Sequence, residues 1–160
     1  MSLLRGVAAG LAAGAAGTTA LNAVTYLDMA VRGRSTSSAP EDVAETLAAK
    51  AGVDIPGQED IRSNRLAGLG PLTGIVAGLG VGSVLGAATA LGFRPSILVG
   101  GALAGAAAMT ATDVPMTLLG ISDPPTWVLQ DWIADAVPHL VYGLVTAAVV
   151  TSLDHRARPF

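Results

Sequence analysis

The fold of this chain is decided by residues 66–93, LAGLGPLTGIVAGLGVGSVLGAATALGF, which contain no charged side chain. These 28 residues exceed the ~20 that a helix needs to cross a hydrocarbon core about 30 Å thick. Glycine recurs within them at every fourth position, at Gly70, Gly74, Gly78, Gly82 and Gly86. Residues four apart share one helix face, and a face of glycines allows another backbone to come close. The stretch therefore predicts a membrane-spanning helix that packs through its glycines.

Three further stretches pass the same test. Residues 6–27 and 95–112 carry no charge, and residues 136–153 carry only His139 as an ionisable group. We therefore expect an all-α integral membrane bundle of four transmembrane helices in a single domain, 1–160. The expected spans cover about residues 5–28, 66–92, 95–120 and 134–153, and the second span is expected at the centre of the bundle because its glycine face needs cover. The short connection at residues 92–95 predicts that the second and third spans are antiparallel neighbours.

Composition supports a membrane protein and excludes several other classes. The chain of 160 residues is 51% hydrophobic and only 13% charged, which is too apolar for an ordinary soluble domain. Its net charge of -3 and its lack of a basic cluster argue against nucleic-acid binding. The absence of cysteine excludes disulfides, thiolate catalysis and Cys-ligated metals.

The longest polar segment is the connector at residues 29–65, where we expect one short amphipathic helix. Ser38-Ala-Pro-Glu41 has the spacing of a capping box, and Pro40 suits a first helical turn. This helix is expected to lie against the membrane surface or the bundle. A second connector carries Asp123-Pro124-Pro125 and then Trp127 and Trp132, the residue type that most often anchors a segment at the membrane interface.

The sparse polar residues of the spans are expected to gather at one end of the bundle. With four spans, the first and third helices end on the side where the fourth begins. The polar cluster expected there consists of Asn22, Tyr26, Asp28, Thr112, Asp113, Asp135 and His139, and no comparable cluster is expected at the other end.

Two interpretations of this cluster remain open. The aspartates can mark the headgroup boundary while Asn22 and the threonines form hydrogen bonds between helices. Alternatively, the group acts on protons, since Asp135 lies four residues before His139 and a buried Asp–His pair can hold or relay a proton near neutral pH. Because a charge within a span is costly, we expect these side chains to face the bundle interior.

The C-terminal third of the chain resembles the YagU-like family of small bacterial inner-membrane proteins. The resemblance rests on Pro115-Met-Thr-Leu-Leu-Gly120, a proline-containing turn, and Asp135-x-x-x-His139-Leu140-Val141. The family has a glutamate where this chain has Asp135. The resemblance implies a bacterial plasma-membrane protein with a loose association to acid tolerance.

Two classes of function therefore compete. The first is a non-enzymatic membrane module whose glycine faces pack it into a homo-oligomer or onto a partner membrane subunit within the lipid bilayer. The second is a conduit or acid-stress sensor that handles protons or small cations. We expect no enzyme activity, cofactor or metal, because the sequence has no paired histidines, no Glu-x-x-His and no recognisable nucleophile motif. Lys and Arg divide almost evenly between the two sides, so orientation rests on the connector between the third and fourth spans, which has none. We expect both termini in the cytoplasm.

Overall fold

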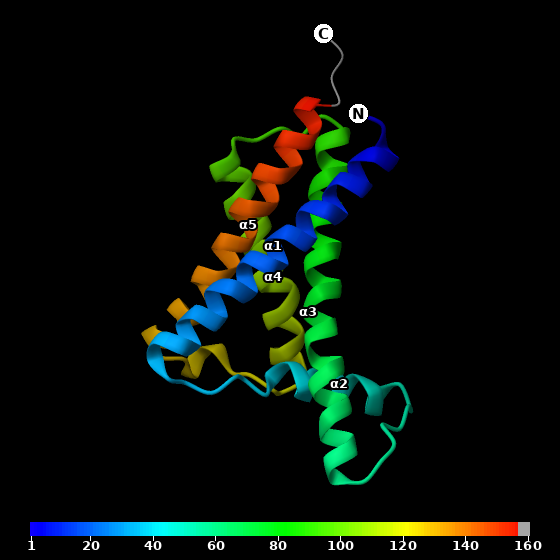
Figure 1. Ribbon diagram of the computed structural model, residues 1–160, viewed down its shortest axis with the longest axis vertical. Helices are drawn as coiled ribbons and strands as arrows, with labels where there is room; N and C mark the ends of the chain where they lie inside the picture. The colour runs from blue at the N-terminus through cyan, green and yellow to red at the C-terminus, as the bar shows by residue number, and fades with distance from the viewer. Residues whose placement is uncertain (157–160) are drawn as a thin grey trace.

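The computed structural model describes residues 1–156 and is all-helical over that range (Figure 1). Four helices are long and apolar enough to cross a membrane, with mean hydropathies of 1.4 to 1.6 in their most apolar windows. Arg158, which the sequence places among the basic residues near the C-terminus, lies outside the described residues. The elements are α1 (Leu3–Arg32), α2 (Ala39–Lys50), α3 (Glu59–Ala90), α4 (Ile97–Leu118), the 3-10 turn η1 (Pro124–Thr126) and α5 (Leu129–Arg156).

Local sequence sets where the long helices begin and end. Ser2 and Ser96 cap α1 and α4, each accepting a hydrogen bond from a backbone N–H three residues later. Gly33 ends α1 in a left-handed conformation with φ 64°, which a residue with a side chain rarely adopts. The four long helices have 30, 32, 22 and 28 residues, so each reaches the ~20 needed to cross the hydrocarbon core.

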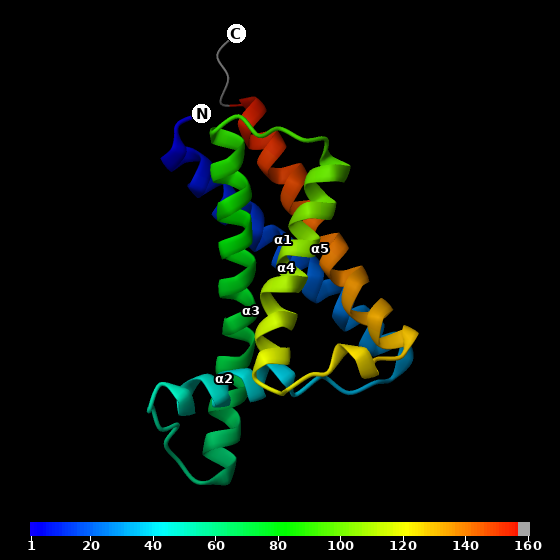
Figure 2. The ribbon, with the colours of Figure 1, turned by 180° about the vertical axis from the view of Figure 1, so that it is seen from behind.

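The helices pack in the spatial order α3, α1, α5, α4. Helix α1 packs extensively against both α3 and α5, and α5 packs against α4, whereas α3 has only slight contact with α4 and α5. The expectation that the second span, α3, lies at the centre is therefore wrong, and the central pair is α1 and α5. The second and third spans, α3 and α4, are antiparallel and in contact as expected, since Val81 and Leu85 of α3 pack near Ala104 and Ala108 of α4, but each helix packs more extensively on another partner (Figures 1 and 2).

Glycines bring the backbones of α1 and α3 into direct contact. A Cβ atom added at Gly6 would lie 2.6 Å from the carbonyl oxygen of Gly86, and one at Gly14 would lie 2.5 Å from that of Gly78. Between these two pairs, Gly10 and Gly82 face each other closely enough that a Cβ on either would collide with the other's carbonyl. No side chain fits between the helices at these three levels.

The glycine face of α3 contacts different partners at different positions along the helix. Gly70 supports the start of α2, where an added Cβ would lie 2.8 Å from the backbone nitrogen of Glu41. Gly74 is exposed and has no atom within 4 Å of an added Cβ. Helix α1 crosses α3 at an angle (Figure 1), and its glycine contacts with α3 end at the pair Gly14–Gly78.

A second glycine contact joins α4 to α5. A Cβ at Gly105 would lie 2.7 Å from the carbonyl oxygen of His139, and one at Gly143 would lie 2.5 Å from the backbone nitrogen of Gly105. Both main glycine contacts are thus made within one chain. The glycine faces from which we expected an oligomer or a partner subunit are therefore mostly covered by other helices of the same chain.

Tyr142 of α5 connects three helices at the centre of the bundle. Its side chain is 1% exposed, and its hydroxyl donates a hydrogen bond of 2.6 Å to the carbonyl oxygen of Gly78 on α3. Gly17 of α1 leaves space for the ring, since a Cβ there would lie 2.8 Å from the Tyr142 Cδ2 atom. Thr146, one turn later, is fully buried and donates to the carbonyl oxygen of Ala13 on α1. Polar side chains of α5 therefore bind the backbones of both α1 and α3.

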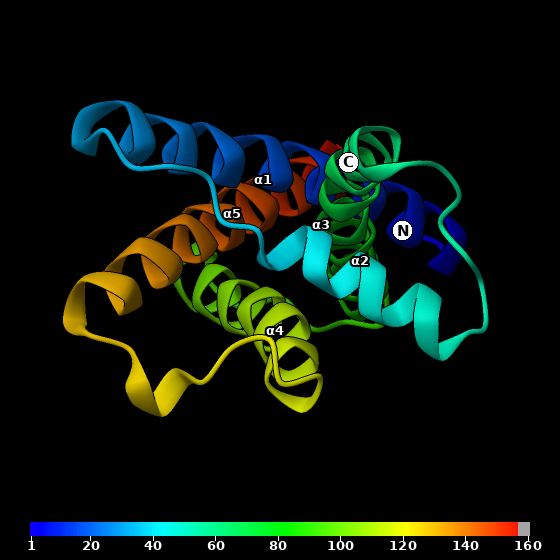
Figure 3. The same cartoon turned by 90° about the horizontal axis from the view of Figure 1, so that it is seen from below.

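The connector helix α2 lies against the first turns of α3, at the end of the bundle opposite the termini (Figures 1 and 3). Arg62 of α3 forms an ion pair of 2.5 Å with Glu45 of α2. The expected capping box is not formed, because the Ser38 hydroxyl donates to the carboxylate of Asp42 and makes no bond to the backbone of the first turn. Ala44 is the only residue of α2 that is fully buried.

Candidate functional site

The candidate site lies between α4 and α5 at the end of the bundle opposite the termini. Helices α1 and α4 end on this side and α5 begins there (Figure 1), as the four-span topology predicts. Helices α4 and α5 touch at Gly105 and His139 and then separate towards this end. The separation leaves room for longer, polar side chains on the two facing helices.

His139 and Asp135 form a close pair on α5. The Nδ1 atom of His139 lies 3.2 Å from Asp135 Oδ1 and 2.9 Å from the backbone carbonyl oxygen of Asp135. Both neighbours are acceptors, so Nδ1 is the nitrogen that carries a hydrogen, and Nε2 is left to accept or release a proton. The His139 side chain is 12% exposed, so the pair is largely enclosed by the protein.

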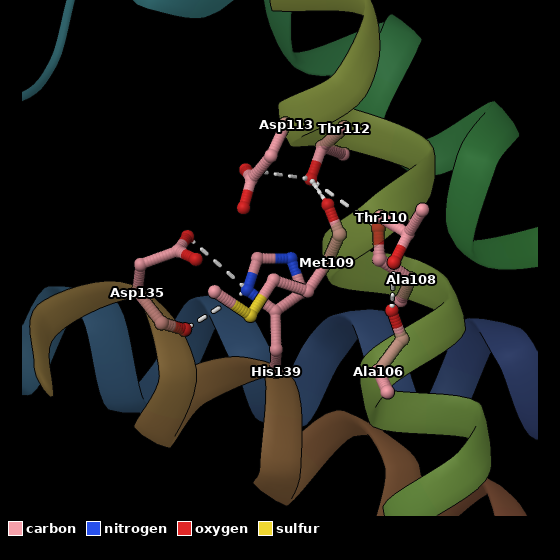
Figure 4. A network of polar contacts seen from close by, with 8 residues as sticks. All are labelled: Ala106, Ala108, Met109, Thr110, Thr112, Asp113, Asp135 and His139. Carbon is pink, nitrogen blue, oxygen red and sulfur yellow. Dashed lines mark hydrogen bonds and ion pairs between the residues drawn. The ribbon is translucent and has the colours of Figure 1, made fainter. Parts of the chain in front are cut away.

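Helix α4 contributes a second carboxylate to the same place. Asp113 points across the gap towards Asp135 and His139 (Figure 4) and interacts with both side chains. Thr112 stands beside Asp113, and its hydroxyl bonds the carbonyl oxygens of Ala108 and Met109 and lies 3.4 Å from Asp113 Oδ1. Asp113, Asp135 and His139, which we call the proton cluster, thus come from two helices.

One oxygen atom of the proton cluster has no donor. Asp135 Oδ2 is buried and accepts no hydrogen bond from any of the described residues. The carboxyl group of Asp113 lies across the gap from the Asp135 carboxylate (Figure 4), and in its ionised form it is another acceptor. A buried acceptor without a donor is costly, and a single proton placed between the two carboxyl groups would satisfy both.

Three residues of α1 expected in this cluster form no hydrogen bond or ion pair with it among the described residues. Tyr26 is 62% exposed, and Asp28 is bound to Arg32 and Arg34, both at 2.6 Å. Asn22 is half-buried and forms no hydrogen bond with the proton cluster among the residues that the structure describes. The last turns of α1 run towards the start of α5 and away from α4 (Figure 3), so α1 adds no hydrogen bond or ion pair to the proton cluster among the described residues.

The side chains of the cluster are not arranged as a metal site. Within residues 1–156, no group of three or more His, Cys, Asp or Glu side chains is arranged to hold a metal ion. The two Trp residues of the preceding connector pack edge to face with their centroids 5.0 Å apart, and Trp127 donates to the Ser122 hydroxyl. Both therefore lie in the segment that leads directly into the Asp135 turn.

The sequence expectation missed a polar pair at the other end of the bundle. Asp154, near the end of α5, has a side chain that is only 4% exposed, and its Oδ2 atom accepts a hydrogen bond of 3.0 Å from Nε of Arg94. The expectation that this end has no polar cluster is therefore wrong. A single aspartate at the end of an apolar run looks like a boundary marker in the sequence, and its pairing depends on a contact 60 residues away.

Comparison of the chain with family models, with curated proteins and with solved structures finds no match, so the resemblance to the YagU-like family remains a prediction.

Proposed function

We propose that this protein is a small proton-sensing membrane protein, and that Asp113, Asp135 and His139 are its proton-binding groups. The observation that carries the proposal is the Asp135 carboxylate, which contacts His139 through Oδ1, has a buried Oδ2 atom without a donor, and lies across the gap from the Asp113 carboxyl group. Such an arrangement changes its internal contacts whenever a proton is bound or released.

The chemistry of the cluster provides two places for a proton. A proton on His139 Nε2 would turn the Asp135 contact into an ion pair, since Nδ1 already donates to that carboxylate. A proton shared by the carboxyl groups of Asp113 and Asp135 would remove the repulsion between two negative charges on neighbouring helices. Either event alters the force between α4 and α5 at the end where these helices separate.

Sensing accounts for this geometry better than conduction across the membrane. A conduit needs polar groups along the whole span, but beyond His139 the α4–α5 contact consists of closely packed glycines and alanines. Tyr142 and Thr146, the nearest polar groups on α5, are buried and bonded to backbone carbonyls. The absence of a metal-holding group in the described chain likewise favours protons over small cations.

The cellular setting belongs to the same proposal. We place the protein in a bacterial inner membrane with both termini in the cytoplasm, so that the proton cluster faces the outer side. This orientation is supported by the connector at residues 119–128, which has no Lys or Arg. The alternative function, a non-enzymatic packing module in an oligomer or on a partner subunit, remains a prediction, but it loses its main support because the glycine faces are covered within the chain.

The test uses the two tryptophans as an internal reporter. Both lie in or beside the connector that leads to Asp135, so movement of α4 against α5 should change their fluorescence. In purified protein in nanodiscs, we expect a transition in tryptophan emission between about pH 8 and about pH 5, the range in which imidazole titrates. His139→Gln and Asp135→Asn, which keep side-chain size and polarity, should each abolish or displace that transition.

The matched control is His155→Gln. The chain has two histidines, and His155 lies at the opposite end of α5, exposed and far from the tryptophans. Its replacement should leave the transition unchanged. A parent protein without any transition, or a transition lost with His155 and kept without His139, would refute the proposal. Circular dichroism of each variant shows whether a lost transition is a lost fold.

A further inference from the structure

The two ends of the bundle differ strongly in charge. The end that holds the connectors at residues 28–65 and the proton cluster has five basic side chains and eleven acidic ones. At the end where the termini meet, the described residues include three basic side chains, Arg5, Arg94 and Arg156, and one acidic side chain, Asp154. An excess of positive charge close to a bilayer surface attracts anionic lipid headgroups.

The basic end contains a cavity of about 280 Å³. It lies where the connector between α3 and α4 passes the last turns of α5 (Figure 2). Its inner part is lined by apolar groups, among them Leu85, Ala147 and Val150, and its polar lining includes Arg94 and Ser96. A cavity with an apolar interior and a cationic group, at the level where three spans end, has the character of a site for a lipid headgroup.

Arg94 is held in a position to bind an anion. Its Nε atom donates to Asp154, whose buried carboxylate fixes the guanidinium, and the Arg94 side chain is still 39% exposed. This hydrogen bond uses Nε and not the two terminal nitrogens of the guanidinium. Those nitrogens form the fork that binds a phosphate group through two parallel hydrogen bonds.

The start of α4 adds a second electrostatic contribution at the same cavity. Ser96 caps this helix and lines the cavity, so the positive end of the helix dipole lies beside the Arg94 side chain. The carboxylate of Asp154 opposes an anion, but it is offset by Arg94 and by the Met1 amino group 4.0 Å away. The local balance therefore remains positive.

We propose that this cavity binds the phosphate group of an anionic phospholipid, with Arg94 as its principal ligand. The volume equals that of about nine water molecules at ~30 Å³ each, which accommodates a phosphodiester and part of its glycerol but not acyl chains. The acyl chains would lie outside, along the exposed apolar surfaces of α3 and α4. A free phosphate ion offers the same oxygen atoms to Arg94, so the test must separate the two sources.

The experiment measures retained lipid by native mass spectrometry of the full chain in detergent, with added phosphatidylglycerol or phosphatidylcholine. We expect phosphatidylglycerol to be retained at least tenfold more than phosphatidylcholine, and inorganic phosphate to compete weakly. Arg94→Gln alone would remove the hydrogen-bonded Arg94 partner of the buried Asp154 and thereby destabilise the protein. The decisive variant is therefore Arg94→Gln combined with Asp154→Asn, which removes both charges and should lose the preference while its circular dichroism stays unchanged.

Two further variants make the result specific. Arg94→Lys keeps the charge but lacks the planar fork, so we expect it to weaken retention severalfold. Arg5→Gln removes a positive charge at the same end from a residue that does not line the cavity, and it should leave retention nearly intact. Retention that survives the double variant, or falls equally with Arg5→Gln, would overturn the proposal. Displacement of the lipid by millimolar inorganic phosphate would refute the proposal that the ligand is a phospholipid and would favour a free phosphate ion instead.

Discussion

Polar side chains in this protein bind mainly to backbone carbonyls. Thr18, Thr89 and Ser83 each donate to the carbonyl oxygen four residues earlier in their own helix. Such local bonds satisfy a hydroxyl in an apolar surrounding without a partner on another helix. Tyr142 and Thr146 are different, because their hydroxyls reach carbonyl oxygens of α3 and α1 and thereby join helices that are distant in the sequence.

The first prediction concerns the Tyr142 hydroxyl. Tyr142→Phe keeps the ring that fills the space above Gly17 but removes the bond to the Gly78 carbonyl. We expect the free energy of unfolding to fall by about 0.6 to 1.7 kcal/mol, the range measured for hydrogen bonds between membrane helices. Unfolding by a denaturing detergent in mixed micelles measures this change.

Tyr26→Phe is the matched control for that measurement. Tyr26 is 62% exposed and forms no hydrogen bond in the part of the chain that the structure describes, so its hydroxyl should contribute little. Equal effects of the two substitutions would show that the Tyr142 bond does not stabilise the bundle.

At the level of elements, glycine spacing determines which helices touch and over how many turns they stay in contact. The contact between α1 and α3 extends over three glycine pairs. Further along α3, Gly70 packs against α2, and Gly74 is exposed. Helices packed at an angle share only a few turns, so a regular stripe of glycines along one helix can serve two partners and leave a gap between them.

The second prediction compares two glycines of α3. A Cβ at Gly82 would collide with the carbonyl oxygen of Gly10 and lie 2.6 Å from Gly14 Cα, whereas a Cβ at Gly80 meets no atom within 4 Å. Gly82→Ala should therefore destabilise the protein by about 1 to 3 kcal/mol, because the helices must move apart. Gly80→Ala should be neutral or stabilise by up to ~1 kcal/mol, because alanine favours the helix.

The difference between these two variants isolates packing from helix propensity, since the same atom is added to the same helix in both. Thermal unfolding of the two proteins in one detergent provides the measurement. Similar melting temperatures for the Gly80 and Gly82 variants would mean that the close α1–α3 contact contributes nothing to stability.

For the whole molecule, the antiparallel helices place different chemistry at the two ends. The N-terminus, Arg94 and Asp154 meet at one end, while the connector helix α2 and the proton cluster lie at the other (Figures 1 and 3). The proposed proton sensing and the proposed lipid binding thus take place on opposite sides of the membrane. Orientation decides which side of the cell each one faces.

The third prediction fixes that orientation. A green fluorescent protein fused after the C-terminus should be fluorescent, because this reporter matures in the bacterial cytoplasm and we place the termini there. Alkaline phosphatase inserted in the connector near Asp123 should be active, since it requires the outer side. A dark C-terminal fusion together with an inactive phosphatase insertion would reverse the proposed orientation.

The sequence by itself determined the fold class and the approximate extent of the helices. Uncharged apolar runs of sufficient length can only be helical in a bilayer, because every backbone group there must be hydrogen-bonded internally. It also predicted the Asp135–His139 pair and its meeting with Asp113, since a spacing of four places two residues on one helix face and topology brings helix ends together. These inferences use local geometry and chain order, which a sequence states directly.

Only the tertiary structure decided which helices pair and which polar residues meet. Helix α1 crosses α3 at an angle and its glycine contact ends at Gly78, while Tyr26 is exposed and Asp28 pairs with Arg32 and Arg34. The pairing of Arg94 with Asp154 and the bond from Tyr142 to Gly78 join residues 60 and 64 positions apart. Crossing angles arise from the packing of whole surfaces rather than from any one repeat, and they are therefore not encoded in the spacing of residues along a single helix.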